Sequence, residues 1–80
     1  MISITSPETL GKVLRRHRKD LGLTQSEVGQ KFNIPQKTVS NIEAGRPGVQ
    51  LATLFKLLSA LNLEINLRQR DVLDNKEALW

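Results

Sequence analysis

Five polar side chains fall within a short stretch that has the residue spacing of one helix. Val39 and Ile42 are three positions apart, so both would face a core if residues 36–43 are helical. The polar side chains then point outward near the start of that helix: Gln36, Lys37, Ser40 and Asn41, with Thr38 at the margin. Amides pair bidentately with adenine, hydroxyls bond either kind of base, and a lysine reaches guanine or a phosphate. These residues predict a surface that reads DNA bases, and the alternative is an ordinary solvated helix face.

A second short helix is predicted directly before this one. Thr24–Glu27 has the pattern of a capping box, in which the threonine and glutamate side chains each bond the other residue's backbone, so a helix begins at Gln25. It ends near Phe32, because Asn33 tolerates left-handed backbone and Pro35 disfavours helix at the residue before it. Two short helices joined by a tight turn have the order of a helix-turn-helix unit, whose second helix enters the major groove.

Longer amphipathic segments flank this pair and would build the core. Ser6, Pro7 and Glu8 have the preferences of a helix start, and Gly22 supplies a left-handed stop. The apolar stripe of that first helix is Leu10, Val13, Leu14 and Leu21, and it includes His17, for which a packed helix position is expected. A fourth helix ends at Asn62 and has core residues at Leu51, Leu54, Phe55, Leu58 and Leu61.

After Asn62 the apolar and polar residues alternate strictly, which is typical of a strand. Leu63, Ile65 and Leu67 would share one side of it. Because a lone strand leaves its backbone groups unpaired, we expect it to pair with the same strand of a second copy, with these three residues in the dimer contact. Residues 71–80 carry three acidic side chains and one basic, which predicts a flexible acidic tail ending in Leu79 and Trp80.

The length, charge and residue types limit the class of protein. Eighty residues suffice for one core, so residues 1–70 are expected to form one domain. Lys and Arg outnumber Asp and Glu by 12 to 8, which fits an anionic partner such as nucleic acid and equally a solvated basic surface. The absence of cysteine and of long apolar runs predicts a cytoplasmic protein without membrane contact. We expect no enzyme activity, cofactor or metal site, since no acid, base, nucleophile or phosphate loop clusters in the sequence.

Three runs of residues have a specific family pattern: Leu23–Val28, Ile34–Gly45 and Thr53–Leu58. They resemble the lambda-repressor-like helix-turn-helix family, also called Cro/CI or XRE, over roughly residues 8–61. The resemblance implies an all-α bundle of four or five helices. It also implies base contacts from Gln36, Lys37 and Ser40, with auxiliary contacts from Thr38 and Asn41.

Phosphate contacts are expected around this surface, from Thr24, Gln25, Arg15 and Arg46. The family implies such a role for Gln25, whereas the alternative is a polar residue that only caps its helix. The basic side chains of the first helix, Arg15, Arg16, Arg18 and Lys19, either contact phosphates or only keep that helix soluble.

Features outside the shared core resemble one branch of the family, the HipB-type antitoxins. They are Ser6 and Pro7 before the first helix, the strand at 63–67 and the acidic tail. The branch implies a homodimer joined by a small intersubunit sheet, repression of its own operon, and neutralisation of a HipA-type serine/threonine kinase toxin. It also implies that Leu79 and Trp80 contact the toxin. The alternative for Trp80 is that it folds back on an apolar patch or stays exposed.

A two-fold dimer would present two recognition helices one DNA turn apart, roughly 34 Å, so the expected operator is an inverted repeat. Two other functions fit the same sequence. One is a phage-type or metabolic repressor with no toxin partner, against which only the tail and the strand argue. The other is a protein-interaction adaptor, which predicts no binding to duplex DNA.

Overall fold

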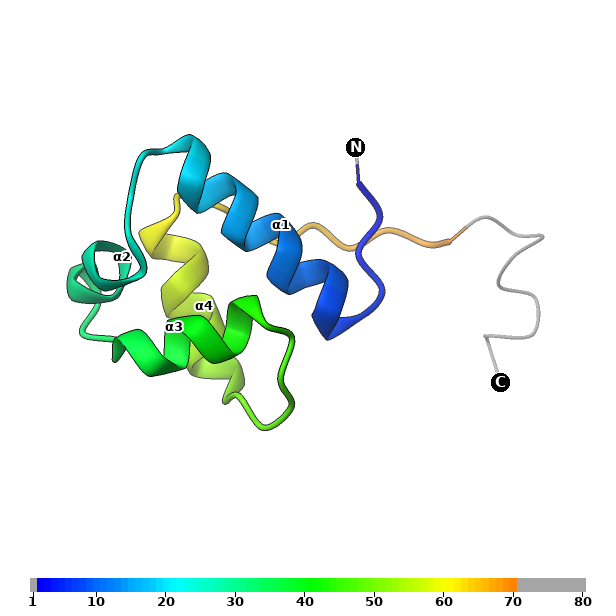
Figure 1. The fold of residues 1–80 in the computed structure, drawn as a ribbon. Helices are drawn as coiled ribbons and strands as arrows, with labels where there is room; N and C mark the ends of the chain where they lie inside the picture. The colour runs from blue at the N-terminus through cyan, green and yellow to red at the C-terminus, as the bar shows by residue number, and fades with distance from the viewer. Residues whose placement is uncertain (1, 71–80) are drawn as a thin grey trace.

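Four helices follow one another in the computed structural model, which describes residues 2–70 (Figure 1). They are α1 (Pro7–Asp20), α2 (Gln25–Lys31), α3 (Gln36–Glu43) and α4 (Leu51–Ala60). α3 packs against α1 and α2, and α4 packs against α2. The predicted all-α bundle is confirmed, with four helices. The predicted acidic tail, with Leu79 and Trp80, lies outside the described residues.

The helix starts and stops follow from local side-chain chemistry. The Ser6 hydroxyl caps α1 by accepting a hydrogen bond from the Thr9 backbone nitrogen at 3.1 Å, and Pro7 is the first helical residue. At α2, the Thr24 backbone nitrogen donates to Glu27 Oε1 at 2.8 Å, while the Glu27 backbone nitrogen donates to the Thr24 hydroxyl at 3.1 Å. The predicted capping box is therefore confirmed.

The turn between α2 and α3 is fixed by backbone packing. Asn33 has φ +58°, the left-handed conformation that the sequence predicts. The Ile34 backbone nitrogen donates to the Gly29 carbonyl oxygen at 2.7 Å, which closes the turn. A Cβ at Gly29 would overlap the Ile34 carbonyl oxygen, so only glycine lets the chain return this closely over α2.

The core is centred on residues from all four helices, and its most enclosed side chains are Leu14, Val28, Val39, Leu57 and Leu61. The predicted core face of α4 is partly wrong. Leu51 and Phe55 are 66% and 48% exposed, whereas Leu57, which the prediction left out, is fully buried. Two overlapping apolar stripes fit the spacing in α4, and the helix buries the one that contains Leu57, Leu58 and Leu61. Leu21 is also exposed, because α1 ends before it.

The predicted strand at 63–67 is not confirmed, because no strand forms anywhere within residues 2–70. Residues 63–70 leave α4 as an extended segment that runs away from the bundle (Figure 1). Leu63 packs against the core, whereas Ile65 and Leu67 are exposed, Leu67 to 93%. A strand needs a neighbouring backbone for its ladder of hydrogen bonds, and residues 63–67 form no such ladder with another segment of residues 2–70.

Candidate nucleic-acid interface

α3 presents its polar side chains outward over two buried apolar residues. Val39 is fully buried and Ile42 is 4% exposed, which confirms that both face the core. Around them, Gln36, Lys37 and Ser40 are exposed, and Thr38 and Asn41 are half-buried at the edges. The predicted orientation of this helix is therefore observed, with donors and acceptors for base edges on its accessible side.

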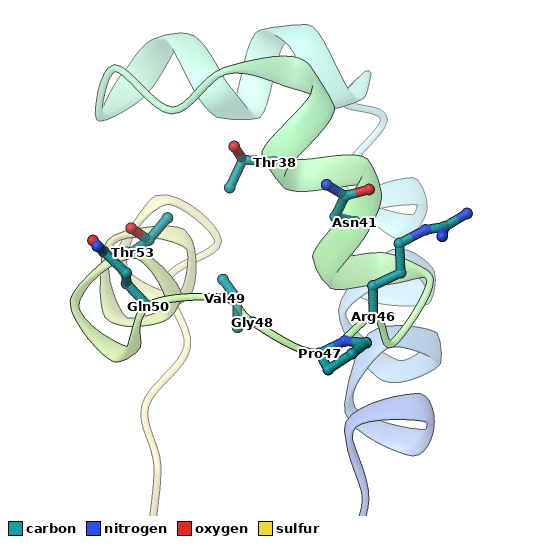
Figure 2. A pocket seen from close by; sticks show the side chains of 8 residues that line it. All are labelled: Thr38, Asn41, Arg46, Pro47, Gly48, Val49, Gln50 and Thr53. Atoms are coloured by element: carbon teal, nitrogen blue, oxygen red, sulfur yellow. The ribbon is translucent and has the colours of Figure 1, made fainter.

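A hollow of about 300 Å³ lies beside α3, at the start of α4. Figure 2 shows Thr38 and Asn41 on one side of it, Gln50 and Thr53 on the other, and the connecting loop along one edge. The remaining lining residues are in that loop, at Arg46, Pro47, Gly48 and Val49. Three of these lining residues were predicted DNA contacts: Thr38, Asn41 and Arg46. Gln50 and Thr53, across the hollow from α3, were not predicted as contacts.

Their place at the start of a helix could have predicted Gln50 and Thr53 as part of the interface. Gln50 is the residue before the first turn of α4, as Thr24 is for α2, and Thr53 is the third residue of that helix. A helix start exposes unpaired backbone N–H groups with a partial positive charge, so polar side chains there extend an anion-facing surface. Both residues therefore belong to the candidate interface.

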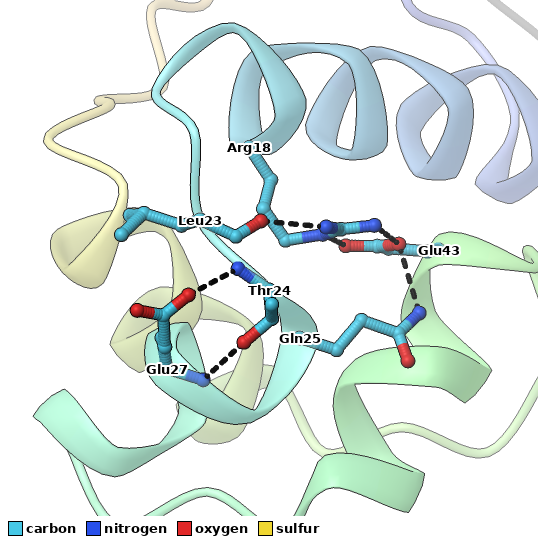
Figure 3. Close-up of polar contacts among 6 residues, drawn as sticks. All are labelled: Arg18, Leu23, Thr24, Gln25, Glu27 and Glu43. Atoms are coloured by element: carbon cyan, nitrogen blue, oxygen red, sulfur yellow. Dashed lines mark hydrogen bonds and ion pairs between the residues drawn. The ribbon is translucent and has the colours of Figure 1, made fainter.

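An ion pair shielded from solvent joins α1 to the end of α3. Arg18 Nε lies 2.6 Å from Glu43 Oε2 and Arg18 Nη2 lies 3.0 Å from Glu43 Oε1, while Nη1 donates to the Leu23 carbonyl oxygen at 2.8 Å (Figure 3). The bond to Glu43 raises the pKa of the Arg18 guanidinium above its usual value, against the lowering effect of burial. Both expectations for Arg18, a phosphate contact or a solubilising surface residue, are wrong because it shares the buried side of α1 with Gly11 and Leu14.

Gln25, at the start of α2, is tied to the same ion pair. Its Nε2 donates to Glu43 Oε1 at 3.1 Å, and Figure 3 shows its amide oxygen pointing away from the carboxylate. The side chain is half-buried, so one side of its amide group is held by Glu43. The first residue of α2 is thereby fixed against the last residue of α3, whose outer face carries the side chains predicted to read bases.

Known proteins share this geometry. A helix-turn-helix family model matches residues 14–67. Antitoxin HipB from Escherichia coli O6:H1 strain CFT073 and from Escherichia coli strain K12 are each 39% identical over 64 residues, which is 80% of this chain and 68% and 73% of those proteins. The chain belongs to the helix-turn-helix family of HipB antitoxins.

Two solved structures of HipB-type proteins superpose closely on this HipB-family chain. A chain of the HipA-HipB-O2-O3 complex has a TM-score of 0.84 at 35% identity, and the match covers 89% of this chain and 100% of that one. A chain of the HipB-O4 20mer complex has a TM-score of 0.83 at 35% identity, with the same coverage. The fold is therefore that of HipB chains over nearly all of the described residues.

Arg46 is the one basic residue within residues 2–70 of this HipB-family chain that lines the hollow beside α3. Arg15 is exposed on α1, and Arg16 forms an exposed ion pair with Asp20 at 3.3 Å. Arg46 lines the hollow through the loop, but Figure 2 shows its guanidinium extending away from α4 along α3. Thr24 uses its hydroxyl in the capping box. Phosphate contacts from Thr24, Gln25, Arg15 and Arg46 stay predictions.

His17 is packed on α1 as expected, since its Nε2 donates to the Leu61 carbonyl oxygen at 3.0 Å and its side chain is half-buried. Within residues 2–70, no group of three or more His, Cys, Asp and Glu side chains is placed to hold a metal ion. None of the helices described there is long and apolar enough to cross a membrane.

Proposed function

We propose that this chain is a sequence-specific DNA-binding repressor that acts as the antitoxin of a HipA-type serine/threonine kinase. The observation that carries the DNA-binding part is the orientation of α3. Gln36, Lys37 and Ser40 are exposed on its outward side, while Val39 and Ile42 hold the opposite side in the core. This is the arrangement in which a recognition helix offers amide, hydroxyl and ammonium groups to base edges.

The surface around α3 supplies the positioning contacts for the duplex backbone in this proposal. Gln25 at the start of α2 and Gln50 at the start of α4 flank α3 along the chain, and Arg46 adds a positive charge at its far end. Thr24 and Arg15 would add further phosphate contacts. Contacts of this kind fix the register of a protein on DNA without reading sequence, and they make its affinity fall with salt.

The antitoxin role rests on the HipB relatives. The solved HipA-HipB-O2-O3 complex contains a HipB chain of the same fold, and the two Escherichia coli HipB antitoxins are 39% identical to this chain over 64 residues. We infer from them a cytoplasmic homodimer that binds an inverted-repeat operator, represses its own operon and neutralises the kinase by binding it. In this proposal Leu63, Ile65 and Leu67 form an intersubunit sheet, and Leu79 and Trp80 contact the toxin.

A selection of duplexes from a random library tests the DNA-binding part. We expect the full chain to enrich an inverted repeat, and its affinity for that repeat to fall about 10³-fold or more between 50 and 200 mM salt. Failure to bind any duplex at low salt would reject this part and favour the adaptor function. The matched control is Gln30→Ala, an exposed change on α2 outside the proposed interface.

Co-purification with the HipA-type kinase encoded nearest to this gene tests the antitoxin part. We expect the full chain to retain the kinase and to lower its phosphorylation rate, and a chain without Leu79 and Trp80 to retain less of it. A chain that binds its operator but not the kinase would be a repressor without a toxin partner.

A further inference from the structure

The Gln25 side chain is held by a residue far away in the sequence. The start of α2 is capped by Thr24 and Glu27, which bond each other through side chain and backbone. The Gln25 amide nitrogen instead donates to Glu43 Oε1 at 3.1 Å, 18 positions along the chain. The amide group is thus bound to the end of α3 rather than to the start of its own helix.

The charge of Glu43 determines which end of that amide faces inward. Arg18 donates to both carboxylate oxygens, so the carboxylate keeps its negative charge beside a permanent cation. An ionised carboxylate has acceptors only, so it binds the amide nitrogen of Gln25 and repels the amide oxygen. Figure 3 shows this orientation, with the nitrogen at Glu43 and the oxygen pointing away.

One N–H bond of the Gln25 amide is left for a partner outside the bundle. The nitrogen carries two donors, which diverge in the plane of the amide, and Glu43 uses one of them. Gln25 is half-buried, so its side chain still reaches the surface. A phosphate has acceptor oxygens only, so it can take this second N–H but not the amide oxygen. The orientation set by Glu43 therefore decides which atom of Gln25 suits the backbone of DNA.

Fixing the amide before binding also favours affinity. A free glutamine side chain has many rotamers, and ordering it on binding costs free energy. Here the Gln25 amide is ordered when the chain folds, because Arg18 holds Glu43 by two bonds and Glu43 holds the amide. A hydrogen bond to a charged acceptor is stronger than one between neutral groups, which favours this orientation over others.

We propose that Glu43 is a positioning residue for DNA binding, which turns the Gln25 amide so that its second N–H meets a phosphate oxygen. The inference rests on the proposed function, because it concerns how the same interface holds the duplex. Glu43 is buried, so it acts through Gln25 and does not contact DNA itself. A phosphate contact carries no sequence information, so the effect of Glu43 is the same on every operator.

A double-mutant cycle of operator affinity tests this role. Glu43→Asp keeps a negative charge for Arg18 and shortens the side chain by one methylene, which separates it from Gln25. We expect Glu43→Asp to weaken binding about 2- to 10-fold in the unchanged chain and to have no effect in a Gln25→Ala chain. In a Gln30→Ala chain, the matched control at an exposed position of α2, Glu43→Asp should keep its full effect. A residue that only stabilises the fold would give the same loss in all three chains.

Operators that differ by single base pairs give a second readout. Loss of a phosphate contact weakens binding to every sequence alike, so Glu43→Asp should leave the ranking of these operators unchanged. A changed ranking would mean that Glu43 acts through the tilt of α3, which overturns the inference. Circular dichroism and urea unfolding check that each variant is folded at the temperature of the binding measurement.

NMR relaxation of the Gln25 side-chain amide tests the same role without any substitution. We expect the unchanged chain, free of DNA, to have an order parameter of about 0.8 for this nitrogen, close to that of rigid backbone. A value below about 0.6 would overturn the inference, because an amide that moves freely is not positioned.

The outcomes separate this inference from the DNA-binding function. If the unchanged chain binds its operator and Glu43→Asp costs as much in the Gln25→Ala chain as in the unchanged one, the positioning role is overturned and the DNA-binding function stands. If the unchanged chain binds no duplex even at low salt, the DNA-binding function is overturned, and the positioning role with it.

Discussion

Arg18 of α1 and Glu43 at the end of α3 form a two-bond ion pair whose side chains are only 9% and 4% exposed. The two residues are 25 positions apart in the sequence, and the pair joins the first helix to the helix that carries the proposed base-reading residues. Because Glu43 also accepts a hydrogen bond from Gln25, one carboxylate connects α1, α2 and α3. The orientation of α3 thus depends on a charge as well as on apolar packing.

Loss of one partner of this pair should be costly. We expect Glu43→Ala to lower the free energy of unfolding by about 3–5 kcal/mol, because it leaves the Arg18 charge buried without a counter-charge. The double variant Arg18→Met with Glu43→Leu should lose much less, since it removes both charges. Urea denaturation measures the free energy of unfolding of the unchanged chain, of Glu43→Ala and of the double variant. Asp20→Ala, which breaks the exposed pair with Arg16, is the control, and an equally small effect of Glu43→Ala would show that the ion pair is dispensable.

The turn of the helix-turn-helix unit should not tolerate a methyl group at Gly29. A Cβ there would overlap the Ile34 carbonyl oxygen, so we expect Gly29→Ala to cost about 1–3 kcal/mol in unfolding free energy. Gln30→Ala, one residue away and exposed, should change it little. Thermal and urea unfolding of the two variants check this, and a Gly29→Ala chain as stable as the original would mean that the turn is looser than the structure shows.

The capping box should make the free energy of unfolding depend on pH. The hydrogen bonds from the Thr24 backbone and hydroxyl lower the pKa of Glu27 below its ordinary value of 4.5. A lowered folded-state pKa contributes stability above about pH 4.5, and that contribution is lost as the pH falls through the folded value. We expect the stability difference between the unchanged chain and Glu27→Gln to shrink from pH 6 to pH 3. A difference that stays constant over this range would contradict the role of the Glu27 charge.

Charge at the extended segment tests the proposed dimer contact. Ile65 and Leu67 are exposed in the single chain, so Ile65→Lys with Leu67→Lys should leave the bundle folded. If residues 63–67 pair between copies, the double variant becomes monomeric and binds the inverted repeat weakly. Sedimentation that shows an intact dimer would remove this segment from the interface.

Local chemistry explains which parts of the fold could be predicted. The cap at Ser6, the capping box and the left-handed Asn33 each depend on a few neighbouring residues, and the spacing of Val39 and Ile42 orients α3. The helices of the candidate interface could therefore be predicted from the sequence, and with them the outward positions of Gln36, Lys37 and Ser40.

Long-range packing explains what could not be predicted. Arg18 and Glu43 are ordinary surface residue types, and only the crossing of α1 over α3 turns them into a buried pair. The buried side of α4 depends on where α2 lies, since two apolar stripes compete for it. The strand at 63–67 needs a neighbour that one chain does not provide within residues 2–70.

The most direct test of the central claim is the affinity of the Gln36→Ala variant for a series of operators that differ by single base pairs. The orientation of α3 predicts that this variant loses about 1–3 kcal/mol of discrimination at one base pair of each half-site and keeps it elsewhere. Lys37→Ala, measured on the same series, separates a base contact from a phosphate contact, because loss of a phosphate contact would weaken binding to all sequences alike. Discrimination that is unchanged at every position in both Gln36→Ala and Ser40→Ala would contradict the claim that α3 reads the bases.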